Sequence, residues 1–268
     1  MEHGSSPFGC YIYCVVPQLT KTSFGKIGID GNEVYPVCYQ DICAVVHACL
    51  PVPYQGDDET VKSWLLTHSD VVDLIWKESG TILPMTFDVI VKGDQTCSAE
   101  ENVRRWLAAN YYDFKFKLEE FRGKVELGIK IFWDSSLITE NLLATSPRLT
   151  ELQEEIKKMP PGKAYFYKHK LDKILEEEFE KKAEEECQRY LRAIQTHVVD
   201  IHYNKIKKGE HPRMILNLSV LASADQVDAL GEELGAIDTE EGVHVRFTGS
   251  WPPYSFTNYL GIKQNDDH

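Results

Sequence analysis

The chain has 268 residues, enough for one large domain or two small ones, and 43% of them are hydrophobic, which argues against wholesale disorder. Its 42 acidic and 29 basic residues give a net charge of −13. Because nonspecific nucleic-acid binding needs basic charge that displaces counterions, this balance argues against it, and the simplest interpretation of the acidity is solubility.

The first third of the chain predicts strands followed by a long helix. Runs rich in Val, Ile and Tyr predict strands at residues 8–16, 33–39 and 42–50. The pair Gln40-Asp41 predicts a tight hairpin, and Pro36 marks the strand before it as an edge strand. From Glu59 to Gly80, apolar residues recur every three or four positions, as in an amphipathic helix. Residues 81–92 are then predicted to be extended.

The middle of the chain predicts a helix, a strand and a charged helical stretch. Ser98 and Glu101 fit a capping box that begins a helix, whose apolar face continues to Phe121. Strict alternation then predicts a strand at 125–133. Residues 135–159 follow as a charged helical stretch that Pro147 interrupts.

The break at residues 160–162, Pro-Pro-Gly, separates this stretch from a long amphipathic helix at 163–197. We expect that helix to pack its apolar stripe on a sheet, and a coiled coil is the alternative. The remaining pattern predicts strands at 198–204, 214–222 and 243–251, with a short helix at 227–234.

Both halves mix strands with helices that would lie on one face of a sheet. This pattern favours an α+β fold with two ferredoxin-like α/β sandwich domains joined by a helical stretch. We expect an N-terminal domain, a helical linker, a C-terminal domain with a long leading helix and a disordered tail, at residues 1–134, 135–162, 163–262 and 263–268.

The seven cysteines are odd in number and include no CxxC pair, which argues against a zinc ribbon or a thioredoxin-like motif. They are interpreted as small buried hydrophobic residues in a reducing compartment. Cys10 and Cys14 would share one face of a strand, which leaves a metal or redox pair open. The start of the chain lacks a basic signal region, and no apolar run reaches about 18 residues, so we expect a soluble, cytoplasmic protein.

Motifs for phosphate, dinucleotide and metal binding are absent from the sequence, as is the nucleophile elbow. His68 lies on an apolar helical stripe, where a hydrogen-bonded core histidine is expected. His197 and His202 flank a helix–strand junction and lack further metal ligands. The glutamate runs at 176–178 and 184–186 are expected to be solvated. The sequence therefore predicts no catalytic, cofactor-binding or metal site.

Four segments, in order along the chain, resemble the gas vesicle protein F/L family. They are the opening strand at 11–16, Leu-Pro-Met-Thr-Phe-Asp at 83–88, Gly-Lys-Val-Glu-Leu-Gly-Ile-Lys at 123–130, and Gly-Ser-Trp-Pro-Pro-Tyr-Ser-Phe at 249–256. The second departs from the family's Leu-Pro-Met-Arg-Phe-Gly at Thr86 and Asp88, and the last has Ser250 where the family has Pro. Gly-Lys-Ala-Tyr at 162–165 is a fifth point of similarity.

The resemblance implies a non-enzymatic assembly factor without a cofactor, located in the cytoplasm and at the gas vesicle. Its implied partners are the main gas vesicle shell protein and other gas vesicle accessory proteins, with neither nucleic acid nor membrane as a partner. The candidate partner-binding residues are Leu83, Pro84, Met85, Phe87, Trp251, Pro252, Pro253, Tyr254 and Phe256. Packing into the core is an alternative role for both segments.

Two other functions are weighed against this one. An enzyme on a ferredoxin-like scaffold rests on analogy of fold alone. An RNA-binding module would stack bases on strand aromatics such as Tyr11, Tyr13 and Tyr39, and the net charge of −13 opposes it.

Overall fold

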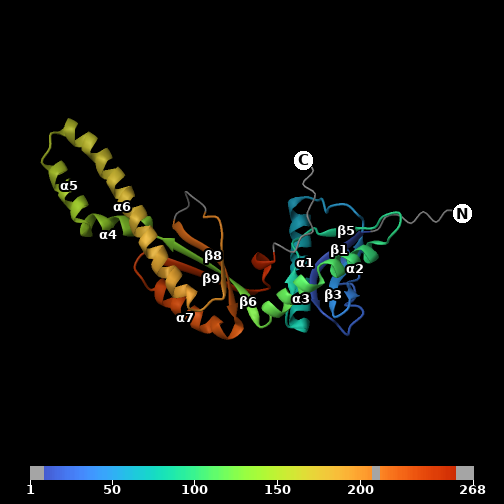
Figure 1. Ribbon diagram of the computed structural model, residues 1–268. Helices are drawn as coiled ribbons and strands as arrows, with labels where there is room; N and C mark the ends of the chain where they lie inside the picture. Colours follow the sequence, from blue (N-terminus) through green and yellow to red (C-terminus); the bar gives the residue numbers. More distant parts are fainter. Residues whose placement is uncertain (1–8, 207–211, 258–268) are drawn as a thin grey trace. The chain divides into compact units, whose positions relative to one another are not determined.

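The computed structural model describes residues 9–206 and 212–257, so the predicted tail at 263–268 lies outside the described residues (Figure 1). The chain forms two compact units, one of residues 1–126 and 250–268, the other of residues 127–249. The chain leaves the first unit within strand β6 (Lys124–Trp133) and returns within strand β9 (Val243–Trp251). The expected domain boundaries, with a helical linker at residues 135–162 between the two domains, stay a prediction.

The first unit is built on an antiparallel sheet with the strand order β2-β3-β1-β4, and β5 also pairs with β1. These strands are Gly9–Pro17 (β1), Tyr35–Tyr39 (β2), Ile42–Cys49 (β3), Leu83–Pro84 (β4) and Ile90–Lys92 (β5). The predicted hairpin is confirmed, because Tyr39 pairs with Ile42 and Gln40 turns the chain at φ +51°. The edge position of β2 is confirmed as well. A 3₁₀ turn, η1 (Ile29–Gly31), lies where the crossover helix of a ferredoxin-like unit would stand.

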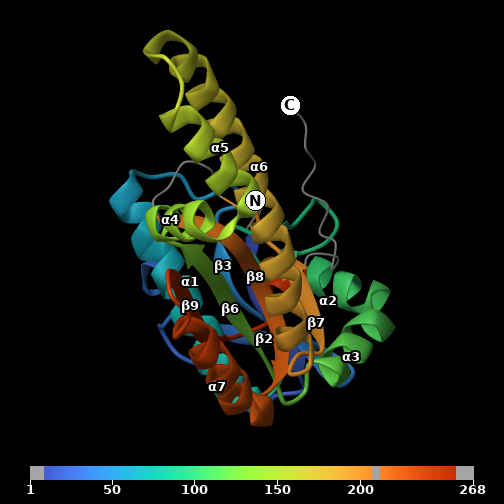
Figure 2. The same cartoon turned by 90° about the vertical axis from the view of Figure 1, so that its left-hand side faces the viewer.

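Helices cover both faces of this sheet, whereas the sequence analysis predicted helices on one face alone (Figures 1 and 2). The helices are α1 (Asp58–Ser79), α2 (Ala99–Ala109) and α3 (Tyr111–Glu120), the last two being one predicted helix that breaks at Asn110. On β1, Tyr11 contacts His68 of α1, while its neighbour Cys10 faces Tyr35, which donates to Glu100 of α2. Because adjacent residues of a strand point to opposite faces, β1 is buried on both sides.

The second unit has the strand order β7-β8-β6-β9. Its other elements are α4 (Ser135–Thr145), α5 (Pro147–Lys157), α6 (Pro161–Gln195), β7 (Asp200–Tyr203), β8 (Arg213–Ser223), η2 (Ala224–Gln226) and α7 (Val227–Asp238). The succession strand, helices, two strands, helix, strand is that of a ferredoxin-like sandwich, and the predicted α+β class is confirmed. Helices α6 and α7 lie over the same face of the sheet (Figure 2), where Phe179 packs edge-on against Trp133 at 5.5 Å. No helix in the described residues is long and apolar enough to cross a membrane.

The core of the first unit contains two buried tyrosine–histidine pairs. The hydroxyl of Tyr11 lies 2.8 Å from His68 Nδ1, and that of Tyr13 lies 2.8 Å from His47 Nδ1. All four side chains are buried, and Tyr11 stacks on the His47 ring at 4.9 Å. The prediction that His68 is a hydrogen-bonded core histidine is therefore confirmed.

The surrounding backbone fixes the direction of the hydrogen bond between Tyr11 and His68. The His68 Nε2 atom lies 3.1 Å from the carbonyl of Met85, which can only accept, so Nε2 carries the proton and Nδ1 accepts. The Tyr11 oxygen accepts from Asp88 N–H, which leaves its own proton for His68. In the other pair the amide of Ile29 donates to Tyr13 in the same way. The His47 Nε2 atom lies 2.9 Å from the Tyr54 hydroxyl, which can donate or accept, so backbone groups fix the tautomer of His68 alone.

Burial lowers the pKa of His47 and of His68 from 6.5 to about 4. Between these pH values the unfolded chain binds protons that the folded chain does not, so acid favours unfolding. We expect the free energy of unfolding to be fully developed above pH 6.5 and to fall as the pH drops to 4, by about 3 kcal/mol for each histidine. Urea unfolding across this pH range measures the fall.

His68→Gln keeps a donor and an acceptor at the site but removes one titrating group, so the pH dependence of the unfolding free energy becomes shallower. The matched control is His169→Gln, which replaces an exposed histidine of α6 and leaves the core untouched. A slope in His68→Gln equal to that of the parent protein contradicts the assignment.

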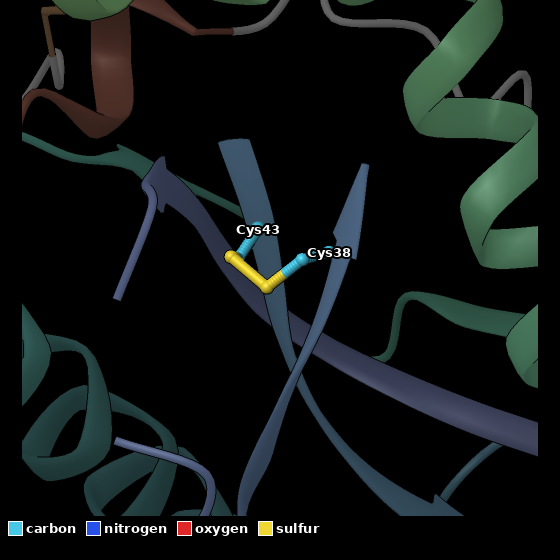
Figure 3. Close-up of a disulfide and its surroundings, with 2 residues drawn as sticks. All are labelled: Cys38 and Cys43. Carbon is cyan, nitrogen blue, oxygen red and sulfur yellow. A yellow bond between two sulfur atoms is a disulfide. The ribbon is translucent and has the colours of Figure 1, made fainter. Parts of the chain in front are cut away.

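Cys38 and Cys43 form a disulfide across the β2–β3 hairpin (Figure 3). The two residues are direct partners in the ladder, with Cα atoms 4.0 Å apart. The prediction of seven reduced cysteines is wrong for this pair, because a two-residue turn brings positions five apart in sequence face to face. The other five cysteines are free, and burial raises the pKa of the Cys10, Cys49 and Cys187 thiols to about 11, so they are protonated at neutral pH.

The expectation that Cys10 and Cys14 share one face of a strand is also wrong. The ladder between β1 and β3 shifts register between Ile12 and Cys14, so a β-bulge interrupts the alternation of side chains. Cys14 belongs to the same apolar cluster as Tyr13 and the α1 residues, while Cys10 faces Tyr35 on the opposite side of the sheet. The two thiols therefore do not form a pair.

Candidate functional site

The four segments that carry the sequence resemblance contribute to one region of the first unit. The opening strand β1 pairs with β4, the first two residues of the second segment, through Cys14 with Pro84 and Val15 with Leu83. The start of the third segment and the end of the fourth are joined by hydrogen bonds between Glu126 and Ser255. We call this region the motif junction.

In the segment 83–88, the first three side chains are buried and the rest are partly or fully exposed. Leu83, Pro84 and Met85 are buried, and the amide of Met85 donates to the Tyr13 carbonyl at 2.9 Å. Proline is tolerated in β4 because this short strand lies at the end of the sheet order, where a missing N–H costs no ladder bond. Thr86, which stands where the family has Arg, is exposed.

Asp88 occupies a backbone conformation that explains why the family motif has glycine there. Its φ is +69°, in the left-handed region, which Gly adopts freely and Asp tolerates better than most residues. Its carboxylate accepts from the amide of Tyr54 at 3.1 Å, and its own amide donates to Tyr11 at 3.2 Å. The departure from the family pattern therefore keeps the turn and adds a hydrogen bond.

The closing segment leaves β9 and packs into the core of the first unit. Pro252 and Pro253 are buried, and the chain then forms the 3₁₀ turn η3 (Tyr254–Phe256), with Phe256 buried at its end. Tyr254 packs against the apolar cluster of β1 and α1. The hydroxyl of Thr257 donates to the Pro84 carbonyl at 3.1 Å, which links the second and fourth segments directly.

Glu126 is a buried carboxylate that anchors the closing segment, and sequence reasoning missed it. One oxygen accepts from the Ser255 amide at 2.8 Å and the other from the Ser255 hydroxyl at 2.5 Å. Glu126 is buried, so its two carboxylate oxygens need hydrogen-bond donors of this kind. The sequence did contain a signal, because Glu126 is an acidic residue inside a strand that otherwise alternates apolar residues regularly.

Among the nine predicted partner-binding residues, the structure divides buried from accessible side chains. Leu83, Pro84, Met85, Pro252, Pro253 and Phe256 are buried. Phe87 and Tyr254 are half-buried, and Trp251 is the most accessible, with 42% of its surface exposed. A partner that contacts this set without unfolding the segment would therefore contact Trp251 first.

The other residues weighed in the sequence lie elsewhere. Tyr11 and Tyr13 are completely buried, so neither can stack a base, and the RNA-binding hypothesis loses two of its three aromatics. In the part of the chain that the structure describes, no group of three or more His, Cys, Asp or Glu side chains could hold a metal ion, at His197 and His202 or elsewhere. The geometry of the motif junction is that of a packed anchor with one exposed aromatic ring.

The Glu126–Ser255 pair is expected to determine how firmly the closing segment is attached. In Glu126→Gln an amide NH₂ replaces one of the two oxygens, so one of the two donors of Ser255 loses its acceptor, and we expect the protein to lose about 1–3 kcal/mol of stability in urea unfolding. The segment 251–257 should also exchange its amide hydrogens faster. Ser255→Ala and the double variant complete a cycle in which the effects are less than additive. Glu241→Gln, at an exposed site, is the control, and additivity would show that the two residues do not act together.

The turn at Asp88 gives a second test. Asp88→Val places a β-branched residue at positive φ and removes the acceptor of the Tyr54 amide, so we expect a loss of about 2 kcal/mol or more. Asp88→Asn tolerates the same backbone and keeps a side-chain oxygen, and its stability should remain within about 0.5 kcal/mol of the parent. Thermal unfolding compares the two variants, and equal losses would mean that backbone conformation is not the constraint.

Comparison of the sequence with known proteins identifies gas vesicle proteins both among family models and among individual relatives. The model of the family described as gas vesicle synthesis protein GvpL/GvpF matches residues 9–258. The chain is 35% identical over 262 residues to gas vesicle protein L1 of Halobacterium salinarum, an alignment that covers 94% of this chain and 92% of the relative. It is 31% identical over 245 residues to gas vesicle protein L of Haloferax mediterranei, covering 87% of this chain and 73% of the relative.

Among solved structures, the fold is similar to the crystal structure of the gas vesicle protein GvpF from Anabaena sp. PCC7120. The TM-score is 0.75 at 16% sequence identity, and the match covers 93% of this chain and 98% of the other. GvpF from Microcystis aeruginosa matches with a TM-score of 0.66 at 18% identity over the same fractions. These two likenesses establish the fold, and the family model and the relatives establish the membership: the chain belongs to the gas vesicle GvpL/GvpF family.

Proposed function

We propose that this protein is a non-enzymatic accessory factor of gas vesicle assembly that binds the main gas vesicle shell protein and other gas vesicle accessory proteins. The observation that carries the proposal is the family match over residues 9–258 together with relatives named as gas vesicle proteins. The protein acts in the cytoplasm and at the vesicle. Its net charge of −13 keeps it in solution while it handles an apolar subunit.

The motif junction suggests how the family motifs serve binding. Six of the nine candidate residues are buried, and the hydrogen bonds of Glu126 and Thr257 hold the closing segment in place. This anchoring presents Trp251 at the point where β9 ends, with its backbone fixed by the two prolines that follow. Tryptophan is among the residues that most often dominate the energy of a protein interface. We therefore assign partner contact to Trp251 and anchoring to the buried residues.

The two alternative functions find no specific support in the structure. Homologous proteins are named as gas vesicle proteins, and an enzyme on this scaffold rests on analogy of fold. For an RNA-binding module, the buried positions of Tyr11 and Tyr13 remove two of the three aromatic rings proposed to stack on bases. A flat RNA titration at low salt is the expected result for the full chain.

Co-purification with the main shell protein tests the proposal. We expect the tagged full-length chain to capture co-expressed shell protein, and Trp251→Ala to weaken the capture about tenfold or more. Tyr112→Ala is the matched control, because Tyr112 is 84% exposed on α3 and lies outside the family motifs. Thermal unfolding of both variants shows that they remain folded.

Two outcomes would count against the proposal. If the parent chain captures no shell protein, direct binding is wrong. If cells that lack the chain build normal vesicles, the assembly role is wrong. If both variants bind as the parent does, the assembly role stands and the assignment of Trp251 is wrong.

A further inference from the structure

The hairpin of α5 and α6 carries a strongly basic segment in an acidic protein. The two helices run side by side away from the sheet of the second unit and meet near residue 160 (Figures 1 and 2). We call residues 157–173 the basic tip. It has a net charge of +5, whereas the whole chain has −13. Its charged residues are six lysines and one aspartate: Lys157, Lys158, Lys163, Lys168, Lys170, Lys173 and Asp172.

Two exposed aromatic rings lie among these lysines. Phe166 is 73% exposed and Tyr165 is 62% exposed, although both lie on a solvent-facing part of a regular helix, where polar residues are usual. Tyr165 packs edge-on against Phe166 at 5.9 Å and against His169 at 5.0 Å, so the rings support one another. Such a preformed aromatic cluster costs little side-chain entropy when a partner binds.

Two of the lysines lie over a third aromatic ring. The ammonium groups of Lys163 and Lys170 lie 5.6 and 5.7 Å from the centre of the Tyr167 ring. The two ammonium groups keep their remaining hydrogens available for carboxylate oxygens of a partner.

The lysines of the basic tip have few carboxylates within their own chain. Among the described residues, Lys157 pairs with Glu154 at 2.7 Å, and the other five lysines have no carboxylate within 4.0 Å. The next stretch of α6, residues 174–186, contains seven glutamates, and six of them already pair with arginine or lysine. These pairs join Arg148 to Glu177 and Glu178, Arg213 to Glu176 and Glu180, Lys181 to Glu185, and Arg189 to Glu186.

We propose that the basic tip binds an acidic segment of another protein, with carboxylates on the lysines and apolar atoms on Tyr165 and Phe166. A second copy of this chain fits less well, because six of the seven glutamates at residues 174–186 already pair within their own chain. A nucleic acid fits less well too, because it carries a negative charge on every phosphate, and the acidic remainder of the chain repels it more strongly than it repels a short acidic segment. The inference rests on the proposed function in one respect, since the partner would be another gas vesicle protein.

Fluorescence anisotropy with the full-length chain tests this inference. The probe is a labelled random copolymer of glutamate and tyrosine, and poly-uridylate of similar length is the comparison. At about 0.15 M salt, where charges are screened beyond about 8 Å, we expect saturable binding of the copolymer and weaker binding of poly-uridylate. Lys168→Glu with Lys170→Glu should weaken copolymer binding about tenfold or more, because two attractive contacts become repulsive.

Matched controls separate the basic tip from general charge and hydrophobicity. Lys26→Glu with Lys62→Glu makes the same change of charge at exposed sites outside the basic tip and should leave binding within about twofold. Phe166→Ala should weaken binding more than Phe116→Ala, whose ring is 68% exposed on α3.

Three results would overturn the inference: no saturable copolymer binding, equal losses in the two lysine pairs, or tighter binding of poly-uridylate than of the copolymer. The assay contains no shell protein. A failure here with successful capture of the shell protein therefore rejects the basic tip alone, and the reverse pattern rejects the proposed function alone.

Discussion

Two tyrosine hydroxyls in the middle of a buried strand impose the constraint on which the first unit depends. A hydroxyl that is removed from water must be hydrogen-bonded, and Tyr11 and Tyr13 meet this need through His68 and His47. Each histidine has to approach from a fixed direction, so the register of β3 and the position of α1 follow from these bonds. The carbonyl of Met85 completes the arrangement and places the segment after α1 against β1.

The position of that segment determines where residues 251–257 can pack. Because Pro84 is held on β1, its carbonyl is available to Thr257, and Glu126 holds Ser255 a few residues earlier. The family motifs therefore act first as packing and hydrogen-bonding elements. The surfaces that we propose for partners are the accessible Trp251 and the lysines and aromatic rings of the hairpin formed by α5 and α6, and these two surfaces differ in chemistry.

Local patterns in the sequence predicted most of the elements because their causes are local. The α1 helix begins at the Asp57 cap and ends at Gly80 in the left-handed conformation, which the apolar period and the glycine indicated. The hairpin turn at Gln40 and the alternating burial of β6 could also be predicted from the local sequence. The family resemblance, read from four short segments, pointed to the family that the comparisons then established. The break of one predicted helix at Asn110 was not visible, because the apolar face continues across it.

The sequence by itself thus determined the class of fold, the succession of strands and helices and the family, since periodicity, caps and motifs are properties of neighbouring residues. The tertiary structure alone decided which distant residues meet. Three features depend on strand register or on the return of the chain to the first unit. They are the disulfide of Cys38, the separation of Cys10 from Cys14 by a bulge, and the burial of Glu126 beneath Ser255. These are set by the requirement to satisfy buried polar groups across the whole unit, and no window of the sequence contains that information.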